Sequence, residues 1–124
     1  MKKATILIVE DDATQRELIR QNLEEVGYEV IEAADGQQAL AVLERCAIDV
    51  AIVDYRLEKE TGVEVIQSLL QRNPLITTIM VTAYGNVENA VEAMKQGAYD
   101  YIIKPLDFEK FLLVLERALE RQKL

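Results

Sequence analysis

Short apolar runs alternate along this chain with longer amphipathic stretches, and turn residues separate the two kinds of segment. Most of the short runs are almost uninterrupted, which is typical of strands covered on both faces, whereas the longer stretches carry apolar residues at helical spacing. The predicted strands are residues 4–9, 28–33, 50–53, 76–81 and 99–103, and the predicted helices are residues 13–26, 35–46, 63–71, 87–96 and 107–122.

Strict alternation of strands and helices predicts a parallel sheet, because right-handed crossovers place successive helices on either face of such a sheet. Gly27 and Gly97 follow predicted helices as stop signals, and Pro74 ends the third one. We therefore predict one α/β domain spanning residues 1–124, a flavodoxin-like (βα)5 fold with five parallel strands in the order 2-1-3-4-5. This scaffold supports many functions, so the function must be inferred from particular residues.

The composition narrows the function classes. Half of the 124 residues are hydrophobic and 29% are charged, as in a soluble globular domain. The balance of 22 acidic against 14 basic residues, a net charge of −8, disfavours direct binding to nucleic acid or to an anionic membrane. No apolar run reaches the length of a membrane span or a signal peptide, so we expect a cytoplasmic location. Cys46 occupies an apolar helical position and is assigned no function.

Polar residues whose side chains could bind a metal or react follow three of the predicted strands. Glu10, Asp11 and Asp12 follow the first strand, Asp54 follows the third, and Lys104 follows the fifth. Parallel strands end at a common edge of the sheet, so these residues are expected to meet. Clustered carboxylates require a compensating cation, and their oxygens suit Mg²⁺ or Mn²⁺. Asp12 adjoins the next helix, where we favour a capping role over metal binding.

Asp54 is placed to act as a nucleophile, since it ends an apolar strand and is partly shielded from water. Attack of a carboxylate on a phosphoryl group requires a metal and hydrogen-bond donors for the transferred charge. Thr82 and Lys104 each follow a strand on the same edge and can supply those donors. Taken singly they read as a turn threonine and a surface lysine, but their joint placement favours a phosphoryl site.

The chain resembles the receiver domain of two-component response regulators over essentially its whole length. Five elements agree in order: the acidic group at 10–12, Asp54, the Thr82-Ala83 pair, Tyr101 and the Lys104-Pro105 pair. The stretches 82–85 and 97–101 look most like receivers of the nitrogen-regulation type, which usually precede an ATPase and a DNA-binding domain.

The resemblance implies that Asp54 accepts a phosphoryl group from the phosphohistidine of a sensor histidine kinase. It implies that Asp11, Asp54 and the backbone carbonyl of Arg56 coordinate Mg²⁺, which Glu10 reaches through water. Lys104 would pair with the phosphoryl oxygens. By the same resemblance this is not an enzyme with turnover: it promotes only its own phosphorylation and slow dephosphorylation.

The resemblance also implies a switch. Thr82 would move inward to hydrogen-bond the phosphate, Tyr101 would rotate into the vacated space, and Ala83 is the small residue preferred beside the phosphoryl group. The Lys104–Pro105 peptide is expected to be cis, which aims the lysine into the site. Glu58 stands where the family often has proline, so the conformation of that loop is left open, although Gly62 matches.

The resemblance places the switched surface on residues 87–96, 99–103 and 107–122, which would control an output domain or partner, expected to be transcriptional. The last helix has more apolar residues than one buried stripe needs, so part of it is expected to face a partner, with a homodimer formed on phosphorylation or a linker contact as candidates. Two alternatives stay open. A haloacid-dehalogenase-like phosphohydrolase also uses a nucleophilic aspartate, but it needs a second aspartate where this chain has Arg56, and a pseudo-receiver would lack part of the acceptor site.

Overall fold

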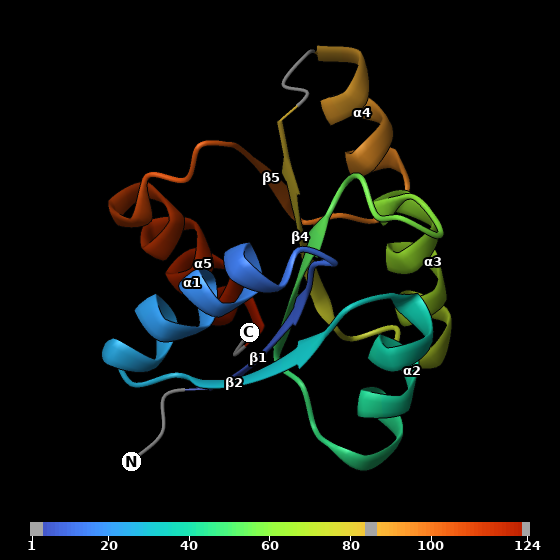
Figure 1. Cartoon of the computed structure of the whole chain (residues 1–124). Coiled ribbons are helices and arrows are strands. Elements are labelled where there is room, and N and C mark those ends of the chain that lie inside the picture. Colours follow the sequence, from blue (N-terminus) through green and yellow to red (C-terminus); the bar gives the residue numbers. More distant parts are fainter. Residues whose placement is uncertain (1–3, 84–86, 123–124) are drawn as a thin grey trace.

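The computed structural model describes residues 4–83 and 87–122 (Figure 1). Its strands are β1 (Thr5–Val9), β2 (Glu29–Ala33), β3 (Val50–Asp54), β4 (Thr77–Thr82) and β5 (Asp100–Ile103), and its helices are α1 (Ala13–Glu25), α2 (Gly36–Arg45), α3 (Gly62–Arg72), α4 (Val87–Lys95) and α5 (Phe108–Gln122). The strands form one parallel sheet in the order β2-β1-β3-β4-β5. The predicted flavodoxin-like fold is confirmed, and each predicted element ends within one residue of the observed one.

Polar residues define where the helices begin. The Asp12 side chain accepts hydrogen bonds from the backbone N–H groups of Thr14 and Gln15 and so caps α1, as predicted. Asp35 caps α2 in the same way through the N–H of Gln38. Glycines follow two of the helices: the residues after α1 and α4 include Gly27 and Gly97, with φ angles of 101° and 110° that L side chains rarely adopt.

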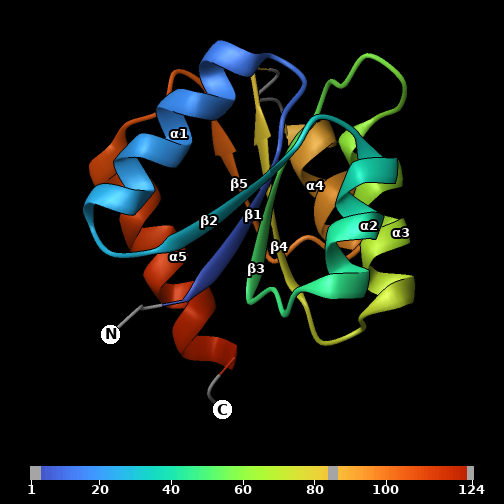
Figure 2. The same ribbon diagram turned by 60° about the horizontal axis from the view of Figure 1, so that its bottom comes forward.

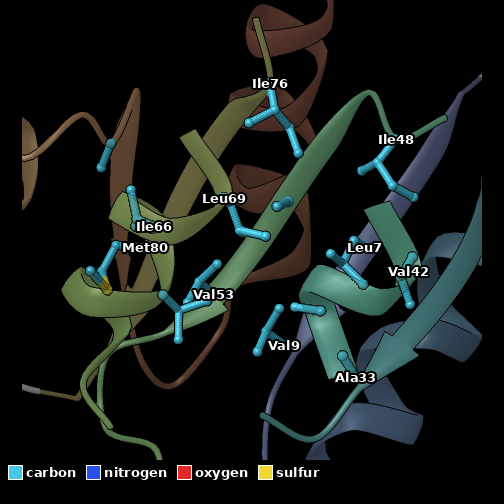
Figure 3. Close-up of a cluster of buried hydrophobic side chains, with 14 of the residues drawn as sticks. Leu7, Val9, Ala33, Val42, Ile48, Val53, Ile66, Leu69, Ile76 and Met80 are labelled. Atoms are coloured by element: carbon cyan, nitrogen blue, oxygen red, sulfur yellow. The ribbon is translucent and has the colours of Figure 1, made fainter. Parts of the chain in front are cut away.

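Helices α1 and α5 cover one face of the sheet, and α2, α3 and α4 cover the other (Figure 2). A hydrophobic core lies on each face. Successive residues of a strand point to opposite faces, and in β1 Leu7 belongs to one core while Ile6 and Ile8 belong to the other. The α2/α3/α4 core, drawn in Figure 3, has the following labelled members: Leu7, Val9, Ala33, Val42, Ile48, Val53, Ile66, Leu69, Ile76 and Met80. The α1/α5 core consists of Ile6, Ile8, Ile19, Leu23, Tyr28, Val50, Ile52, Ile79, Val81, Phe111, Leu115 and Ala118.

Some apolar residues of the predicted helical stripes lie outside these cores. Leu18 shares the apolar spacing of α1 but is 53% exposed, because only Ile19 and Leu23 of that helix are buried against the sheet. In α5, Phe111 and Leu115 are fully buried, whereas Leu113 is 53% exposed. The prediction that α5 has apolar residues to spare is confirmed. None of the helices in the described ranges is long and apolar enough to cross a bilayer.

Candidate functional site

The register of the sheet brings the ends of β1 and β3 together. Val9 lies opposite Val53, so the next residues, Glu10 and Asp54, emerge side by side at the carboxyl edge. Both side chains lie on the α1/α5 side of the sheet, where they line a small hollow with Ile19. Glu10 is 3% exposed and Asp54 is 8% exposed, so both carboxylates are held away from bulk water.

An acidic cluster forms at this edge. Glu10, Asp11 and Asp54 each offer a carboxylate oxygen, and these oxygens lie within 4.8 Å of one another. Three converging oxygen ligands fit the preference of Mg²⁺ for carboxylates. Asp12 is not part of this cluster, because its side chain caps α1. The structure thus brings together the three carboxylates that the sequence predicted as metal ligands and leaves out the one predicted as a cap.

Lys104 is the cation of the site. Its Nζ lies 2.8 Å from Oδ1 of Asp54 and 3.2 Å from Oε1 of Glu10, and it donates a hydrogen bond of 2.9 Å to Oε1 of Gln15. The backbone N–H of Lys104 donates to the carbonyl of Thr82, which ties the end of β5 to the end of β4. The Lys104–Pro105 peptide bond is cis, as expected.

Burial and neighbouring charges both shift the pKa values of the site residues. Burial raises the pKa of Glu10, and the nearby charge of Asp54 raises it further. Burial also raises the pKa of Asp54, although the hydrogen bond and charge of Lys104 oppose that shift. For Lys104, burial alone would lower the pKa, but the hydrogen bond and charge of Asp54, with those of Glu10, raise it overall. Lys104 therefore keeps its positive charge beside Asp54 and Glu10. One positive charge does not balance the three carboxylates of the cluster, and a divalent cation would correct that imbalance.

The remaining predicted residues on β4, β5 and the chain after β4 are Thr82, Ala83 and Tyr101. Thr82 ends β4 one residue beyond Val81, the partner of Asp54 in the sheet, and it is 4% exposed. Ala83 follows it and is exposed. Tyr101 in β5 is half-buried and packs against the α2/α3/α4 core. Thr82 and Lys104 therefore lie on the edge that carries Asp54, whereas the movements of Thr82 and Tyr101 during switching stay a prediction.

Arg56 follows Asp54 by two residues, and its backbone N–H donates a hydrogen bond to the Asp54 carboxylate. Its carbonyl as a metal ligand stays a prediction. The loop that contains it closes on itself, because Arg56 pairs with Thr61 in a short antiparallel bridge and the N–H of Gly62 donates to the carbonyl of Tyr55. This answers the question that Glu58 left open about the conformation of the loop.

Gly62 is required by the closeness of this loop. A Cβ atom at position 62 would lie 2.4 Å from the carbonyl oxygen of Asp54 and 2.9 Å from the Cα of Tyr55. Both contacts are with backbone, which cannot move aside without shifting the end of β3. The match at Gly62 noted in the sequence therefore has a steric reason.

Arg16 and Gln15 are site residues whose contacts the sequence did not predict. The guanidinium of Arg16 donates a 2.7 Å hydrogen bond to the carbonyl of Glu10 and pairs with Glu32 of β2 at 3.0 Å, so it fixes the acidic loop to the sheet. An arginine in the first turns of the helix after an acidic loop was the available signal. Gln15 gave no signal of its contact with Lys104, since many exposed glutamines occur at helix starts.

Comparisons with known proteins agree with this geometry. The sequence-family model for the response regulator receiver domain matches residues 6–116. The transcriptional regulatory protein ZraR of Klebsiella oxytoca is 38% identical over 123 residues, which cover 99% of this chain and 28% of that protein. A putative NtrX-like response regulator of Rickettsia felis is 36% identical over 126 positions, covering 100% of this chain and 26% of that protein. The chain thus spans about a quarter of the length of these curated relatives.

Solved structures show the same fold. A CheY-like response regulator receiver domain protein from Methanospirillum hungatei has a TM-score of 0.90 and 34% identity, with 97% of this chain and 96% of that chain covered. NtrX from Brucella abortus, crystallised with ADP, has a TM-score of 0.92 and 34% identity, with 99% of this chain and 28% of that chain covered. The resemblance identified from the sequence is confirmed: the chain belongs to the family of response regulator receiver domains of two-component systems.

Proposed function

We propose that this domain is a phosphorylation-controlled switch in which Asp54 accepts a phosphoryl group from the phosphohistidine of a sensor histidine kinase. One observation carries the proposal. The buried Asp54 carboxylate lies 2.8 Å from the Lys104 ammonium and within a cluster of three carboxylates whose oxygens converge within 4.8 Å. That arrangement supports the proposal, because phosphoryl transfer to a carboxylate needs a nucleophile, a cation for the transferred charge and metal ligands close together.

The transfer itself is a displacement at phosphorus. An oxygen of Asp54 forms a bond to phosphorus while the phosphorus–nitrogen bond of the donor imidazole breaks, and the nitrogen keeps the electron pair. A Mg²⁺ ion held by Glu10, Asp11, Asp54 and the carbonyl of Arg56 would neutralise charge on the phosphoryl oxygens. Mn²⁺ suits the same ligands. Because the ligands cluster around the nucleophile, phosphorylation is expected to depend on the metal.

Lys104 and Thr82 serve the phosphorylated form. Lys104 exchanges its contacts with Asp54 and Glu10 for the phosphoryl oxygens, as its position between them allows. The hydroxyl of Thr82 donates to the same group, with Ala83 leaving room beside it. Tyr101 then moves toward the space that Thr82 leaves. The phosphate thereby favours one of two arrangements of the domain.

The switched surface consists of α4, β5 and α5. Exposed large apolar residues occur on all three elements: Val91 and Met94 on α4, Ile103 on β5 and Leu113 on α5. Such residues suit contact with an output domain, a partner protein or a second copy of this domain. The output is transcriptional in this proposal, since the relatives include proteins named transcriptional regulators. Because a net charge of −8 disfavours contact with DNA, the proposal gives DNA contact to another domain.

The proposal treats residues 1–124 as one receiver domain that works in the cytoplasm with a sensor histidine kinase. It assigns the domain no catalytic turnover beyond its own phosphorylation and slow dephosphorylation. A phosphohydrolase of the haloacid-dehalogenase kind is disfavoured because Arg56 occupies the place of its general acid. A pseudo-receiver is disfavoured because Asp54 lies beside Lys104 and within a group of three carboxylates that could hold a metal ion.

The test is the intact-protein mass after incubation with acetyl phosphate and Mg²⁺. We expect one phosphoryl adduct, lost in the Asp54→Asn variant and in the presence of EDTA, and retained in the Asp12→Asn variant, which alters only the cap. Absence of an adduct on the folded, metal-loaded chain would instead support a pseudo-receiver. Repeated hydrolysis of phosphomonoesters would support the phosphohydrolase.

A further inference from the structure

The peptide unit that joins Glu10 to Asp11 lies between two residues of the carboxylate cluster. Its carbonyl oxygen, which belongs to Glu10, accepts a 2.7 Å hydrogen bond from Nη1 of Arg16. A hydrogen bond from a guanidinium is charge-assisted and therefore stronger than one between neutral groups. Because a peptide unit is planar, a partner that fixes its carbonyl also fixes the direction in which the chain enters Asp11. Arg16 thus restrains the backbone of both proposed metal ligands.

The other bonds of Glu10 hold it to the sheet and to the next turn. Its backbone N–H donates a 3.0 Å hydrogen bond to the carbonyl of Ala33, at the end of β2. Oε2 of its side chain accepts a 3.3 Å hydrogen bond from the N–H of Asp12. A part-buried backbone carbonyl also needs a partner, because leaving it without one costs free energy. The carbonyl of Glu10 has that partner in Arg16.

Glu32 of β2 orients the guanidinium of Arg16. It lies opposite Ile8 in the sheet, so its side chain is on the α1/α5 face and reaches α1. Oε1 of Glu32 accepts a 3.0 Å hydrogen bond from Nε of Arg16, while Oε2 lies 3.0 Å from Nε of Arg20. The side chain of Arg16 is only 19% exposed, so this pairing is partly shielded from water. The fixed donors of a planar guanidinium can bond a carboxylate and a carbonyl at the same time.

We propose that Arg16 is a positioning residue for the metal site, and that Glu32 is a second positioning residue that acts through Arg16. The arginine fixes the peptide unit between Glu10 and Asp11, so that both carboxylates converge on Asp54 before a cation arrives. Partners of this kind orient metal ligands, and their loss typically weakens metal binding by about tenfold to a hundredfold. This inference rests on the proposed Mg²⁺-dependent function.

Arg20 supplies a matched control on the same helix. Its ion pairs are with three glutamates outside the cluster: Glu17, Glu24 and Glu32. Arg16→Met and Arg20→Met each remove one positive charge and one contact with Glu32. Only Arg16→Met also removes the donor to the carbonyl of Glu10. The two variants therefore differ in the one contact that the proposal depends on.

The sign of the change in affinity separates positioning from simple charge. Loss of a positive charge near the carboxylates would by itself favour Mg²⁺ binding, and it would do so in both variants. A proton–nitrogen NMR titration of the unphosphorylated chain with Mg²⁺ gives each dissociation constant. We expect about tenfold weaker binding in Arg16→Met, and the parent affinity or slightly tighter binding in Arg20→Met. Unchanged or tighter binding in Arg16→Met would overturn the inference.

Glu32 supplies a second comparison, in which the change of charge is the same in both variants. Glu32→Ala and Glu32→Gln both remove the negative charge, but glutamine retains an oxygen that can accept from Nε of Arg16. We expect weaker Mg²⁺ binding in Glu32→Ala and recovery of most of the parent affinity in Glu32→Gln. Equal dissociation constants would overturn the role of Glu32. Urea unfolding in EDTA provides the control, because a purely structural role would alter stability without altering the affinity of the folded domain.

The hydrogen bond has a signature that needs no metal. In the metal-free chain, the carbonyl carbon of Glu10 is expected to resonate downfield, and to shift upfield in Arg16→Met but not in Arg20→Met. A carbonyl carbon that did not shift would overturn the inference. Failure of the parent chain to bind Mg²⁺ would overturn both the proposed function and this inference. Normal binding by the parent, with equal affinity in Arg16→Met, would overturn this inference alone.

Discussion

Carboxylates at the same edge of the sheet experience opposite environments. Asp35, at the start of a helix, accepts the N–H of Gln38, and that hydrogen bond lowers its pKa. Asp54, at the end of a strand, is buried, and burial raises its pKa even though Lys104 contacts it. The first arrangement stabilises the fold, whereas the second costs stability, which the proposed function explains as a feature of a reactive site. Position relative to a helix start therefore separates structural from functional acidic residues.

The neighbours Asp11 and Asp12 offer the sharpest test of this comparison. Asp11→Asn removes a charged oxygen ligand, so we expect Mg²⁺ to bind at least about tenfold more weakly. Asp12→Asn retains a good helix cap and lies outside the cluster, so the parent affinity is expected. A Mg²⁺ titration followed by NMR measures both. A larger loss in the Asp12 variant would show that the metal ligands had been assigned one position out of register.

The capping carboxylate is expected to matter for stability. Asp35→Ala leaves the N–H of Gln38 without its acceptor and should lower the free energy of unfolding by about 1 kcal/mol. Asp35→Asn retains an acceptor and serves as the matched control. Urea unfolding of the metal-free chain provides the measurement. If both variants lost the same stability, the charge of Asp35 and its pairing with Lys59 would outweigh the cap.

Replacing the buried carboxylate of Asp54 is expected to change the stability in the opposite direction. Asp54→Asn removes a charge that burial disfavours, so the metal-free domain should become more stable by roughly 0.5–1 kcal/mol. The loss of the ion pair with Lys104 limits the gain. Urea unfolding in EDTA decides the sign. A net loss of stability would mean that the pairing with Lys104 outweighs the burial of the charge.

The dependence of stability on pH is the smallest expected effect. The pKa values of Glu10 and Asp54 are raised above their ordinary values of 4.5 and 3.8, so the folded state binds protons more tightly than the unfolded state. Their contribution to stability is fully present below those ordinary values and is lost as the pH rises through the raised ones. Asp35 has a lowered pKa, so its contribution is present above its ordinary value of 3.8 and is lost as the pH falls through the lowered one.

The measurable consequence lies in the comparison with Asp54→Asn. At neutral pH the variant should exceed the parent in stability, and this advantage should shrink by a few tenths of a kcal/mol or more under mildly acidic conditions, where the parent carboxylate takes up a proton. Urea unfolding at a series of pH values in EDTA tests this. An advantage that grew on acidification would contradict the raised pKa of Asp54.

Most of the fold could be predicted because hydrophobic spacing is a local property. Uninterrupted short runs such as residues 50–53 are typical of strands covered on both faces, and residues such as Asp35 have a well-defined preference for helix starts. The exposure of Leu18 was not predicted, because helical spacing does not show how wide a stripe of α1 the sheet covers.

Some contacts of the candidate site could be predicted from the sequence in the same way, and others could not. The convergence of Glu10, Asp54 and Lys104 followed from topology alone, since the carboxyl ends of parallel strands share an edge. The hydrogen bonds from Arg16 to the carbonyl of Glu10 and from the N–H of Glu58 to Asp11 were not predicted. One partner in each is a backbone group, which every residue has, so only the folded loop determines where it lies.

The steric requirement at Gly62 has a consequence for mutational tolerance. With Asp54 at one end and a glycine pressed against its carbonyl at the other, the loop of residues 55–61 has a fixed span, while Glu58 and Lys59 within it are exposed. The exposed side chains of Glu58 and Lys59 can therefore be varied in a library, and variants at these two positions should be recovered as folded domains. Libraries that vary position 62 should instead yield few folded members at any loop sequence.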